Sequence, residues 1–296
     1  MLNIISDVFA AERTKLFSLC YRMLGERAGA EDAVQDTWLK WAAADTAHID
    51  NPQAWLRRVA TNVAIDTLRS AHRHREVYVG PWLPEPLIQS DAEMTPPHFE
   101  LAQECELALL WAMERLTEKE RAAFILREAF DASYPEIAAT LGTTEAACRQ
   151  LVSRSQKKLQ TSGPRFDATP EEVAELSQRF FSAIMAQNFD EALALFTPDS
   201  IAITDGGAKK RAARRPLIGG DEIVQVLRAQ YEKAQSEQGW STRVSMVNGK
   251  PAFLRYHYGL LDSVTTLAPC RNGKIAWLYI MRNPDKLGAA IHSMDH

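Results

Sequence analysis

Apolar residues in the segment 131–160 recur at helical spacing and predict two helices joined by a tight turn. The first helix has its apolar stripe at Tyr134, Ile137, Ala138 and Leu141. Ser133 and Glu136 have the spacing of a capping box, which marks the start of this helix. The turn falls at Gly142-Thr143, and Thr144 is a suitable N-cap for the second helix.

The second of these helices has two faces of different chemistry. One side carries Cys148, Leu151, Val152, Ser155 and Leu159. The opposite side carries only small, amide and basic side chains, namely Ala146, Arg149, Gln150, Ser153, Arg154 and Lys157. Arg and Gln can pair with guanine and adenine edges in the major groove, and Lys can contact phosphate. The pattern fits equally a DNA-reading helix and an ordinary helical hairpin with a solvated basic face.

The segment 5–75 also has helical periodicity throughout. A helix over Ala30–Ala44 places on one side Ala33, Val34, Trp38 and Trp41. Asn51-Pro52 is a cap followed by proline at the first helical position, and it opens a further helix. That helix becomes basic toward its end, at Arg69, Arg73 and Arg75. These basic residues could bind phosphate or could simply be the solvated end of a helix, and the pattern fits both interpretations equally.

Residues 77–98 interrupt the helical pattern and read as a linker rich in proline. Its apolar residues are too many for a free linker and predict docking on another part of the chain: Trp82, Leu83, Leu87 and Ile88. Helices resume over 99–162, where Thr117 and Glu120 form a second capping box.

A different domain is predicted over 169–285, followed by a frayed tail at 286–296. It opens on a third capping box at Thr169 and continues as helices. Strand-like segments follow at Ser200–Thr204, Trp240–Val247, Ala252–Tyr258, Ser263–Cys270 and Lys274–Met281, with a helix at Gly220–Lys233. Helices followed by a curved antiparallel sheet predict an α+β cone. The glycine-containing, strongly basic segment Asp205–Arg215 is expected to be a mobile loop.

Composition limits these interpretations in three ways. A chain of 296 residues suffices for two or three domains, while its net charge of −4 gives no general affinity for nucleic acid. DNA contacts would therefore depend on local faces and on a partner that supplies most of the affinity. The four cysteines lack metal-ligand spacing, so we expect no metal and no cofactor. No signal peptide or membrane span is evident, which predicts a cytoplasmic protein without membrane contact.

The order of these parts resembles a known family. Residues 5–160 resemble a group-four, extracytoplasmic-function (ECF) RNA polymerase sigma factor. Region two of that family is matched by AEDAVQDTWLKW and NPQAWLRRVATNVAIDTLRS, within 1–76. Region four is matched by LTEKERAAFILREAFDASYPEIAATLG and CRQLVSR, within 99–162. The resemblance implies two all-α domains, a region-two helical bundle and a region-four helix-turn-helix.

The C-terminal domain resembles a SnoaL-like domain of the nuclear-transport-factor-two-like fold, an extension carried by sigma factors of the SigJ type. Three short motifs of that type are similar here: WLPEPL at Trp82–Leu87, DGGAK at Asp205–Lys209 and NPDKL at Asn283–Leu287. Ala208 stands where the second motif usually has its third glycine.

The resemblance implies a role for each matched position. Contact with the clamp helices of the largest subunit of core RNA polymerase is implied for Asp32, Gln35, Asp36 and Trp38. Contact with the −10 promoter element is implied for Asn62, Asp66, Arg69 and Arg73. The −35 element would be read by Arg149, Gln150, Ser153, Arg154 and Lys157. Regulatory contacts between domains are implied for Trp82, Pro84, Asp205, Gly206, Gly207, Asn283 and Pro284.

The resulting expectation is a non-catalytic sigma factor that directs core polymerase to specific promoters and is regulated by its own C-terminal domain. The alternative is a SnoaL-like isomerase or hydrolase fused to a DNA-binding module. Its acid–base candidates would be Asp205, His257 and Asp262. In either case the cone leaves room for a small ligand of unspecified chemistry.

Overall fold

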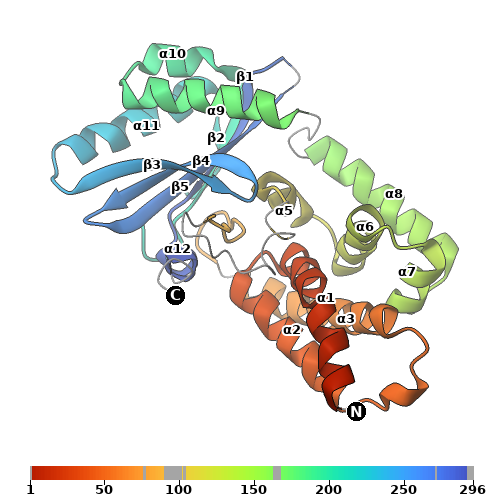
Figure 1. Cartoon of the computed structure of the whole chain (residues 1–296). Helices are drawn as coiled ribbons and strands as arrows, with labels where there is room; N and C mark the ends of the chain where they lie inside the picture. Colours follow the sequence, from red (N-terminus) through yellow and green to blue (C-terminus); the bar gives the residue numbers. More distant parts are fainter. Residues whose placement is uncertain are drawn as a thin grey trace. The chain divides into compact units, whose positions relative to one another are not determined.

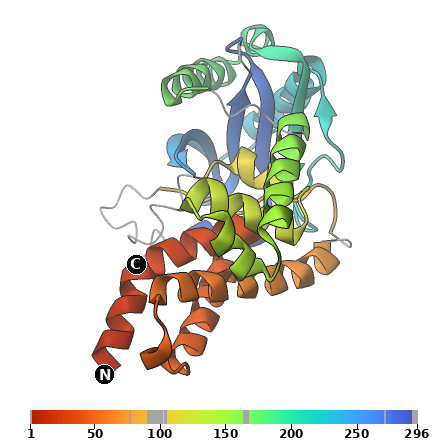
Figure 2. The same ribbon diagram turned by 90° about the vertical axis from the view of Figure 1, so that its right-hand side faces the viewer.

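The chain forms two compact units in the computed structural model, which describes residues 2–75, 78–89, 102, 105–162, 168–270 and 272–291 (Figure 1, Figure 2). The first unit comprises Met1–Val77, Met94–Cys105 and Leu110–Ser162. The second comprises Tyr78–Glu93, Glu106–Leu109 and Gly163–His296. The segment that directly follows the N-terminal helices therefore belongs to the C-terminal unit. Among the described residues, no helix is long and apolar enough to cross a membrane.

The first unit is helical. Its first three helices are α1 (Leu2–Leu24), α2 (Arg27–Ala42) and α3 (Pro52–Arg75), with a short 3-10 turn at Thr46–His48. The later helices are α6 (Glu118–Phe130), α7 (Tyr134–Leu141) and α8 (Glu145–Ser162). Helix α5 (Leu107–Met113) precedes them, with Leu107–Leu109 counted in the second unit and the rest in the first. Gly142, at φ 60°, ends α7 in the left-handed conformation that glycine adopts without strain, and the predicted turn is confirmed.

The helix starts follow the predicted capping signals. All three capping boxes are present, at Thr117–Glu120, Ser133–Glu136 and Thr169–Glu172. Thr144 accepts a hydrogen bond from the backbone N–H of Ala147, at 3.2 Å. Asn51 does the same for the N–H of Ala54, at 3.0 Å. These side chains satisfy backbone donors that the first helical turn leaves unpaired.

One buried arginine links α6 to α1 within the first unit. Arg121 is fully buried, and its Nε donates to the carbonyl oxygen of Arg22 at 3.1 Å. Its Nη1 pairs with the carboxylate of Glu114. Because a buried guanidinium must be compensated, this arginine fixes α6 against the end of α1.

The second unit is a six-stranded mixed sheet covered by helices. The strands are β1 (Phe196–Asp205), β2 (Leu217–Ile218), β3 (Trp240–Val247), β4 (Lys250–His257), β5 (Leu260–Pro269) and β6 (Ile275–Met281). The strand order is β2-β1-β6-β5-β4-β3. The expectation of a purely antiparallel sheet was wrong at one place, because β1 pairs with β6 in parallel. A long connection through α11 (Gly220–Gln235) and β3–β5 separates the two strands, which permits the parallel pairing.

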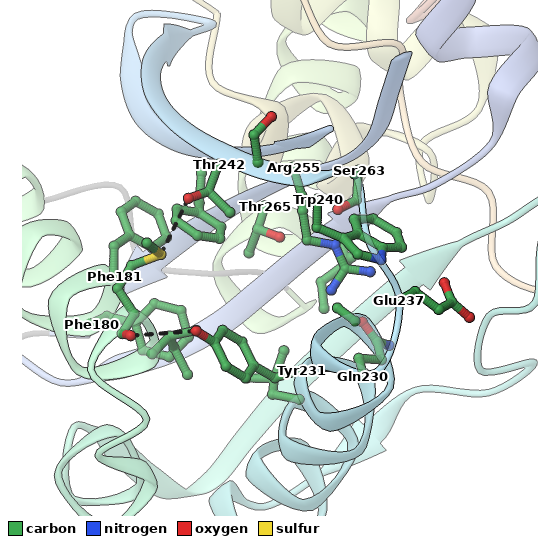
Figure 3. Close-up of a pocket in the computed structure, with 18 of the residues that line it drawn as sticks. Phe180, Phe181, Gln230, Tyr231, Glu237, Trp240, Thr242, Arg255, Ser263 and Thr265 are labelled. Carbon is green, nitrogen blue, oxygen red and sulfur yellow. Dashed lines mark hydrogen bonds between the residues drawn. The ribbon is translucent and has the colours of Figure 1, made fainter. Parts of the chain in front are cut away.

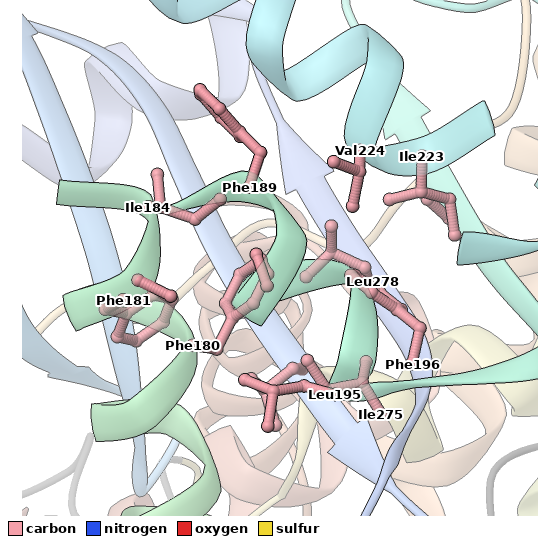
Figure 4. Packing of buried hydrophobic residues seen from close by; sticks show 14 of the residues in the cluster. Phe180, Phe181, Ile184, Phe189, Leu195, Phe196, Ile223, Val224, Ile275 and Leu278 are labelled. Atoms are coloured by element: carbon pink, nitrogen blue, oxygen red, sulfur yellow. The ribbon is translucent and has the colours of Figure 1, made fainter. Parts of the chain in front are cut away.

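The core of this unit lies between the sheet and the helices α9 (Pro170–Met185), α10 (Phe189–Ala194) and α11. Figure 4 shows Phe180 and Phe196 side by side in this core, and their rings meet edge to face with centroids 5.6 Å apart. Isoleucine and leucine from the sheet fill the other side, including Ile275 and Leu278. These contacts make a helix-covered sheet with an apolar core, in agreement with the α+β expectation.

The end of the chain differs from the predicted tail. Helix α12 covers Pro284–Ile291, and Leu287 is 1% exposed. An apolar side chain buried this deeply anchors the helix, so 286–291 is ordered structure.

Candidate functional site

The outer face of α2 carries the residues expected to contact polymerase. Asp32, Gln35 and Asp36 are exposed. Trp38 is only half-buried, with its ring centroid 5.0 Å from that of Phe9. Leu39, for which the sequence pattern gave no signal, is 58% exposed and lies on the same helical face, three, four and seven residues after Asp36, Gln35 and Asp32. This face therefore combines two carboxylates, an amide and an exposed apolar side chain.

The other two tryptophans of the region-two helices pack inside the first unit. Trp41 is 2% exposed, and its ring centroid lies 5.3 Å from that of the half-buried Trp55. This tilted aromatic pair joins α2 to α3 and positions the exposed face of each helix.

The exposed face of α3 carries the residues expected at the −10 element. Asn62, Asp66 and Arg69 are exposed, and Asp66 and Arg69 pair at 3.4 Å. Arg73 lies where side chains are outside the described part of the structure. The opposite face is buried in the bundle through Leu56, Val63 and Leu68. Burial of that face presents the polar one to solvent.

All five residues expected to read the −35 element are exposed on α8: Arg149, Gln150, Ser153, Arg154 and Lys157. The other face is buried, with Cys148 and Ser155 at 0% exposure and Val152 at 3%. Ser155 donates through its hydroxyl to the carbonyl oxygen of Glu120 on α6, at 3.0 Å. The two-faced pattern inferred from the sequence thus corresponds to one buried and one solvated face.

Arg149 and Arg154 on this face also have intramolecular partners. Arg149 pairs with Glu145 at 3.0 Å, and its guanidinium lies 4.9 Å from the ring centroid of Tyr134. Arg154 lies 3.5 Å from Glu120, which Lys158 contacts more closely, at 2.7 Å. Burial tends to raise the pKa of Glu120, but the hydrogen bonds from Lys158 and Thr117 together outweigh it and lower that pKa. Glu120 therefore stays ionised and holds α8 against α6.

The segment Tyr78–Gln89 docks on the C-terminal sheet, within the second unit. Leu83, Leu87 and Ile88 are 3%, 7% and 6% exposed. The N–H of Leu87 donates to Asn248 Oδ1 at 2.9 Å, and the Asn248 N–H donates to the Leu87 carbonyl at 3.0 Å. Ile88 forms an isolated antiparallel bridge with Val247. Leu87 and Ile88 are thus bound at the end of β3 and the turn that follows.

A buried carboxylate at the end of β1 binds the same segment. Asp205 is fully buried and accepts from the Tyr78 hydroxyl at 2.6 Å and from the Leu83 N–H at 2.9 Å. Lys286 of α12 donates to Asp205 at 2.8 Å and to the Leu83 carbonyl at 2.5 Å. Asn283 donates to the Tyr78 hydroxyl at 2.7 Å. We call these five residues the Asp205 network.

The glycines of the DGGAK motif make room for this network. A Cβ on Gly206 would lie 2.3 Å from the carbonyl oxygen of Lys210. Gly207 has φ +55°, and a Cβ there would lie 2.8 Å from the side chain of Asn283. Ala208 is exposed and is not among the residues with positive φ, so the third position tolerates a side chain.

Aromatic rings enclose the ammonium of Lys286. Its Nζ lies 4.1 Å from the Trp82 ring and 5.1 Å from the Tyr78 ring. Burial, reinforced by Asp205, raises the pKa of Tyr78, which therefore remains a hydroxyl donor. Pro84 is buried beside Trp82, and Pro284 begins α12. The structure thus brings the three motifs together, with Lys286 of the NPDKL motif at their meeting point. It adds Tyr78, for which proximity to the WLPEPL motif was the only sequence signal.

The basic loop after Asp205 is held by ion pairs, in contrast to the mobile loop expected. Lys210 contacts Asp262 at 2.9 Å, and Arg215 contacts Glu222 at 2.5 Å. Arg282 donates to the carbonyl of Arg211 at 2.9 Å. Lys210 and Arg215 are thus paired with acidic residues outside the loop, which a charge count of the loop alone does not reveal.

The three acid–base candidates occupy structural positions. Asp205 is the centre of its network, and Asp262 is 4% exposed with Lys210, Arg255 and Arg282 around it. His257 stacks on Trp240 with ring centroids 4.3 Å apart. None of the three lines the C-terminal cavity described below.

Comparisons with known proteins agree with the two helical faces. Residues 8–74 match the family Sigma-70 region 2, and residues 106–159 match Sigma-70, region 4. The ECF RNA polymerase sigma factor SigJ of Mycobacterium tuberculosis is 34% identical over 94% of this chain and 91% of its own. A probable ECF sigma factor SigI of the same organism is 27% identical over 96% and 94%. The chain belongs to the ECF RNA polymerase sigma factors.

Within that family the similarity to SigJ extends through the C-terminal unit. The crystal structure of M. tuberculosis SigJ superposes with a TM-score of 0.76, at 29% identity, over 97% of this chain and 98% of that one. The fusion of two sigma domains to a mixed-sheet domain is therefore shared with SigJ, and the fused-enzyme alternative is not favoured.

Proposed function

We propose that this sigma factor binds core RNA polymerase through the outer face of α2. The supporting observation is the exposed stripe Asp32, Gln35, Asp36 and Leu39, with Trp38 half-buried at its side. An apolar centre with a charged rim is the usual composition of a protein interface. Its partner would be the clamp helices of the largest subunit, in the cytoplasm, where the polymerase works.

Two further exposed faces would read the promoter. On α3, Asn62, Asp66, Arg69 and Arg73 would contact the −10 region, and the outer face of α8 would lie in the major groove at −35. The exposure of all five α8 residues supports this assignment. A bidentate side-chain–base pair contributes about 1–3 kcal/mol to discrimination.

Run-off transcription tests the −35 assignment, with core polymerase and the DNA upstream of a neighbouring gene as template. Arg149→Ala is expected to lower −35-dependent transcription by about 5- to 150-fold, the equivalent of 1–3 kcal/mol. Lys119→Ala, which removes an exposed lysine from α6, is the matched control and should leave transcription unchanged. Full activity of both Arg149→Ala and Arg154→Ala would contradict the assigned face.

The C-terminal domain would regulate the sigma factor by fixing the path of the chain between regions two and four. This proposal rests on the Asp205 network, which binds Tyr78 and Leu83 of that connection with two carboxylate oxygens and one lysine. We expect the domain to act by binding, since the acid–base candidates of the enzyme alternative, Asp205, His257 and Asp262, do not line its cavity.

Promoter templates that differ in the spacing of their −10 and −35 elements test this regulation. The double variant Asp205→Asn, Lys286→Met should release the connection between regions two and four from the C-terminal domain. The full chain should then initiate transcription over a wider range of −10 to −35 spacings. Lys209→Met, which removes an exposed lysine of the same motif, should keep the wild-type range. An unchanged range in the double variant would refute the regulatory proposal without affecting the −35 assignment.

A further inference from the structure

The C-terminal unit contains a cavity of about 490 Å³ between α9, α11 and the sheet. Most of its wall is apolar and aromatic, including Phe180, Phe181, Ile184, Leu227 and Phe253. Cavities of 300–1,000 Å³ with such walls bind small organic molecules. The volume and the wall therefore fit a ligand with one or two rings or a medium-length chain.

One end of the cavity is polar. Figure 3 shows the guanidinium of Arg255 beside Trp240, near Gln230 and Glu237, while Phe180 and Phe181 lie on the other side. The Arg255 side chain is 14% exposed, and its guanidinium carbon lies 4.3 Å from the Trp240 ring centroid. A ligand with an apolar body and one polar end would match this arrangement.

The charge of Arg255 is poorly compensated by the protein. Its contact with Asp262, at 3.4 Å, is longer than those made by Lys210 at 2.9 Å and Arg282 at 3.0 Å. Three cations thus share one carboxylate. Within the described residues, Arg255 Nε is buried without a hydrogen-bond partner. Burial lowers the pKa of Arg255, as expected for a cation that lacks a full counter-charge.

The other carboxylate near this end does not remove the imbalance. Glu237 lies at the cavity wall, but it is 41% exposed and pairs with Lys233 across one helical turn, at 4.0 Å. Solvent screens such a surface carboxylate. The indole Nε1 of Trp240 is also buried without a partner among the described residues, which adds a second donor at this end.

We propose that this cavity binds an apolar organic carboxylate, whose anion pairs with Arg255 and whose hydrocarbon body lies against Phe180, Phe181 and Phe253. A charge-assisted pair with a guanidinium is stronger than a neutral hydrogen bond, so charge should decide affinity among ligands of equal shape. The proposal concerns binding within the C-terminal unit and stands apart from the promoter assignments.

Calorimetric titration of the full chain with two isosteric pairs tests this proposal. The pairs are 1-naphthaleneacetate with 1-naphthaleneacetamide, and decanoate with decanamide. At least one acid should bind about tenfold more tightly than its amide, because only the acid carries the anion. Arg255→Met should reduce the affinity for that acid to that of the amide. Arg179→Met, the same change at an exposed arginine of α9 outside the cavity, should have no effect.

A second variant keeps the test valid if Arg255→Met does not fold, as judged by circular dichroism. Ala234→Trp places a large ring in the cavity and should abolish binding of the acid, whereas Lys233→Trp on the exposed side of α11 should not. Three results would overturn the proposal: equal affinity for acid and amide, equal loss in Arg255→Met and Arg179→Met, or no binding of either acid at millimolar concentration.

Discussion

Lys286→Met should release the segment Tyr78–Gln89 from the C-terminal sheet. The lysine donates to both Asp205 and the Leu83 carbonyl, and its side chain is only 9% exposed. Its removal leaves a fully buried carboxylate with neutral donors alone, from Tyr78, Leu83 and Gly207. Breaking a buried ion pair on one side costs about 3–5 kcal/mol. Because those three donors remain, we expect the lower end, about 3 kcal/mol.

Hydrogen exchange at the Leu83 and Leu87 amides measures this loss directly. Both amides donate to side chains of the C-terminal unit, so their exchange reports local opening of the segment. A loss of about 3 kcal/mol corresponds to exchange faster by on the order of 100-fold. Lys209→Met is the matched control, since Lys209 pairs with Asp285 at the surface, both being over 60% exposed. Its effect should stay below about 1 kcal/mol.

A double variant separates the ion pair from the loss of packing. Asp205→Asn with Lys286→Met removes both charges, so the combined loss should be smaller than the sum of the single losses, by about 1–3 kcal/mol. Strict additivity, or a loss under about 1 kcal/mol in Lys286→Met, would refute the view that a buried ion pair fixes this segment.

Three further predictions concern stability. Gly206→Ala should speed exchange in the same segment, because its new methyl group would lie 2.3 Å from the Lys210 carbonyl oxygen. Arg121→Met should lower the free energy of unfolding of the helical unit by about 3 kcal/mol in urea titration, since it leaves Glu114 without its buried partner. Burial tends to raise the pKa of Asp262, but Arg282 and Lys210 outweigh it and lower that pKa. Wild type should therefore be thermally more stable than Asp262→Asn at neutral pH. This difference should shrink as the pH falls below about 4.

Local signals in the sequence predicted the local structure. Capping boxes, Gly142 and the alternation of faces on α8 depend on residues within a few positions of one another. The β3–β4 turn at Asn248-Gly249 depends on a signal of the same local kind, because Asn-Gly is a typical hairpin turn and both residues have positive φ. The β4–β5 turn was not identified, because Tyr258, at φ 49°, is not a typical residue for that conformation.

Contacts between distant residues could not be predicted in this way. Lys286 lies 81 positions from Asp205, and Tyr78 lies 127 positions from it. The motifs indicated that these regions matter, but the atoms that meet depend on the parallel pairing of β1 with β6, which places Asp205 beside Met281. The position of Arg255 at the cavity likewise could not be predicted, because the sequence of its strand does not indicate which face of the sheet lines a cavity.

The order of the Asp205 network along the chain has a consequence for protein synthesis. The segment that it holds ends at Gln89, whereas Lys286 is made 197 residues later (286 − 89). At about 5–20 residues per second, the ribosome needs on the order of 10–40 s to cover that distance. Both sigma domains leave the ribosome before the network can form. During each round of translation the nascent chain therefore passes through a state in which Leu83, Leu87 and Ile88 have no covering sheet, and any chain that stops short of α12 remains without the full network.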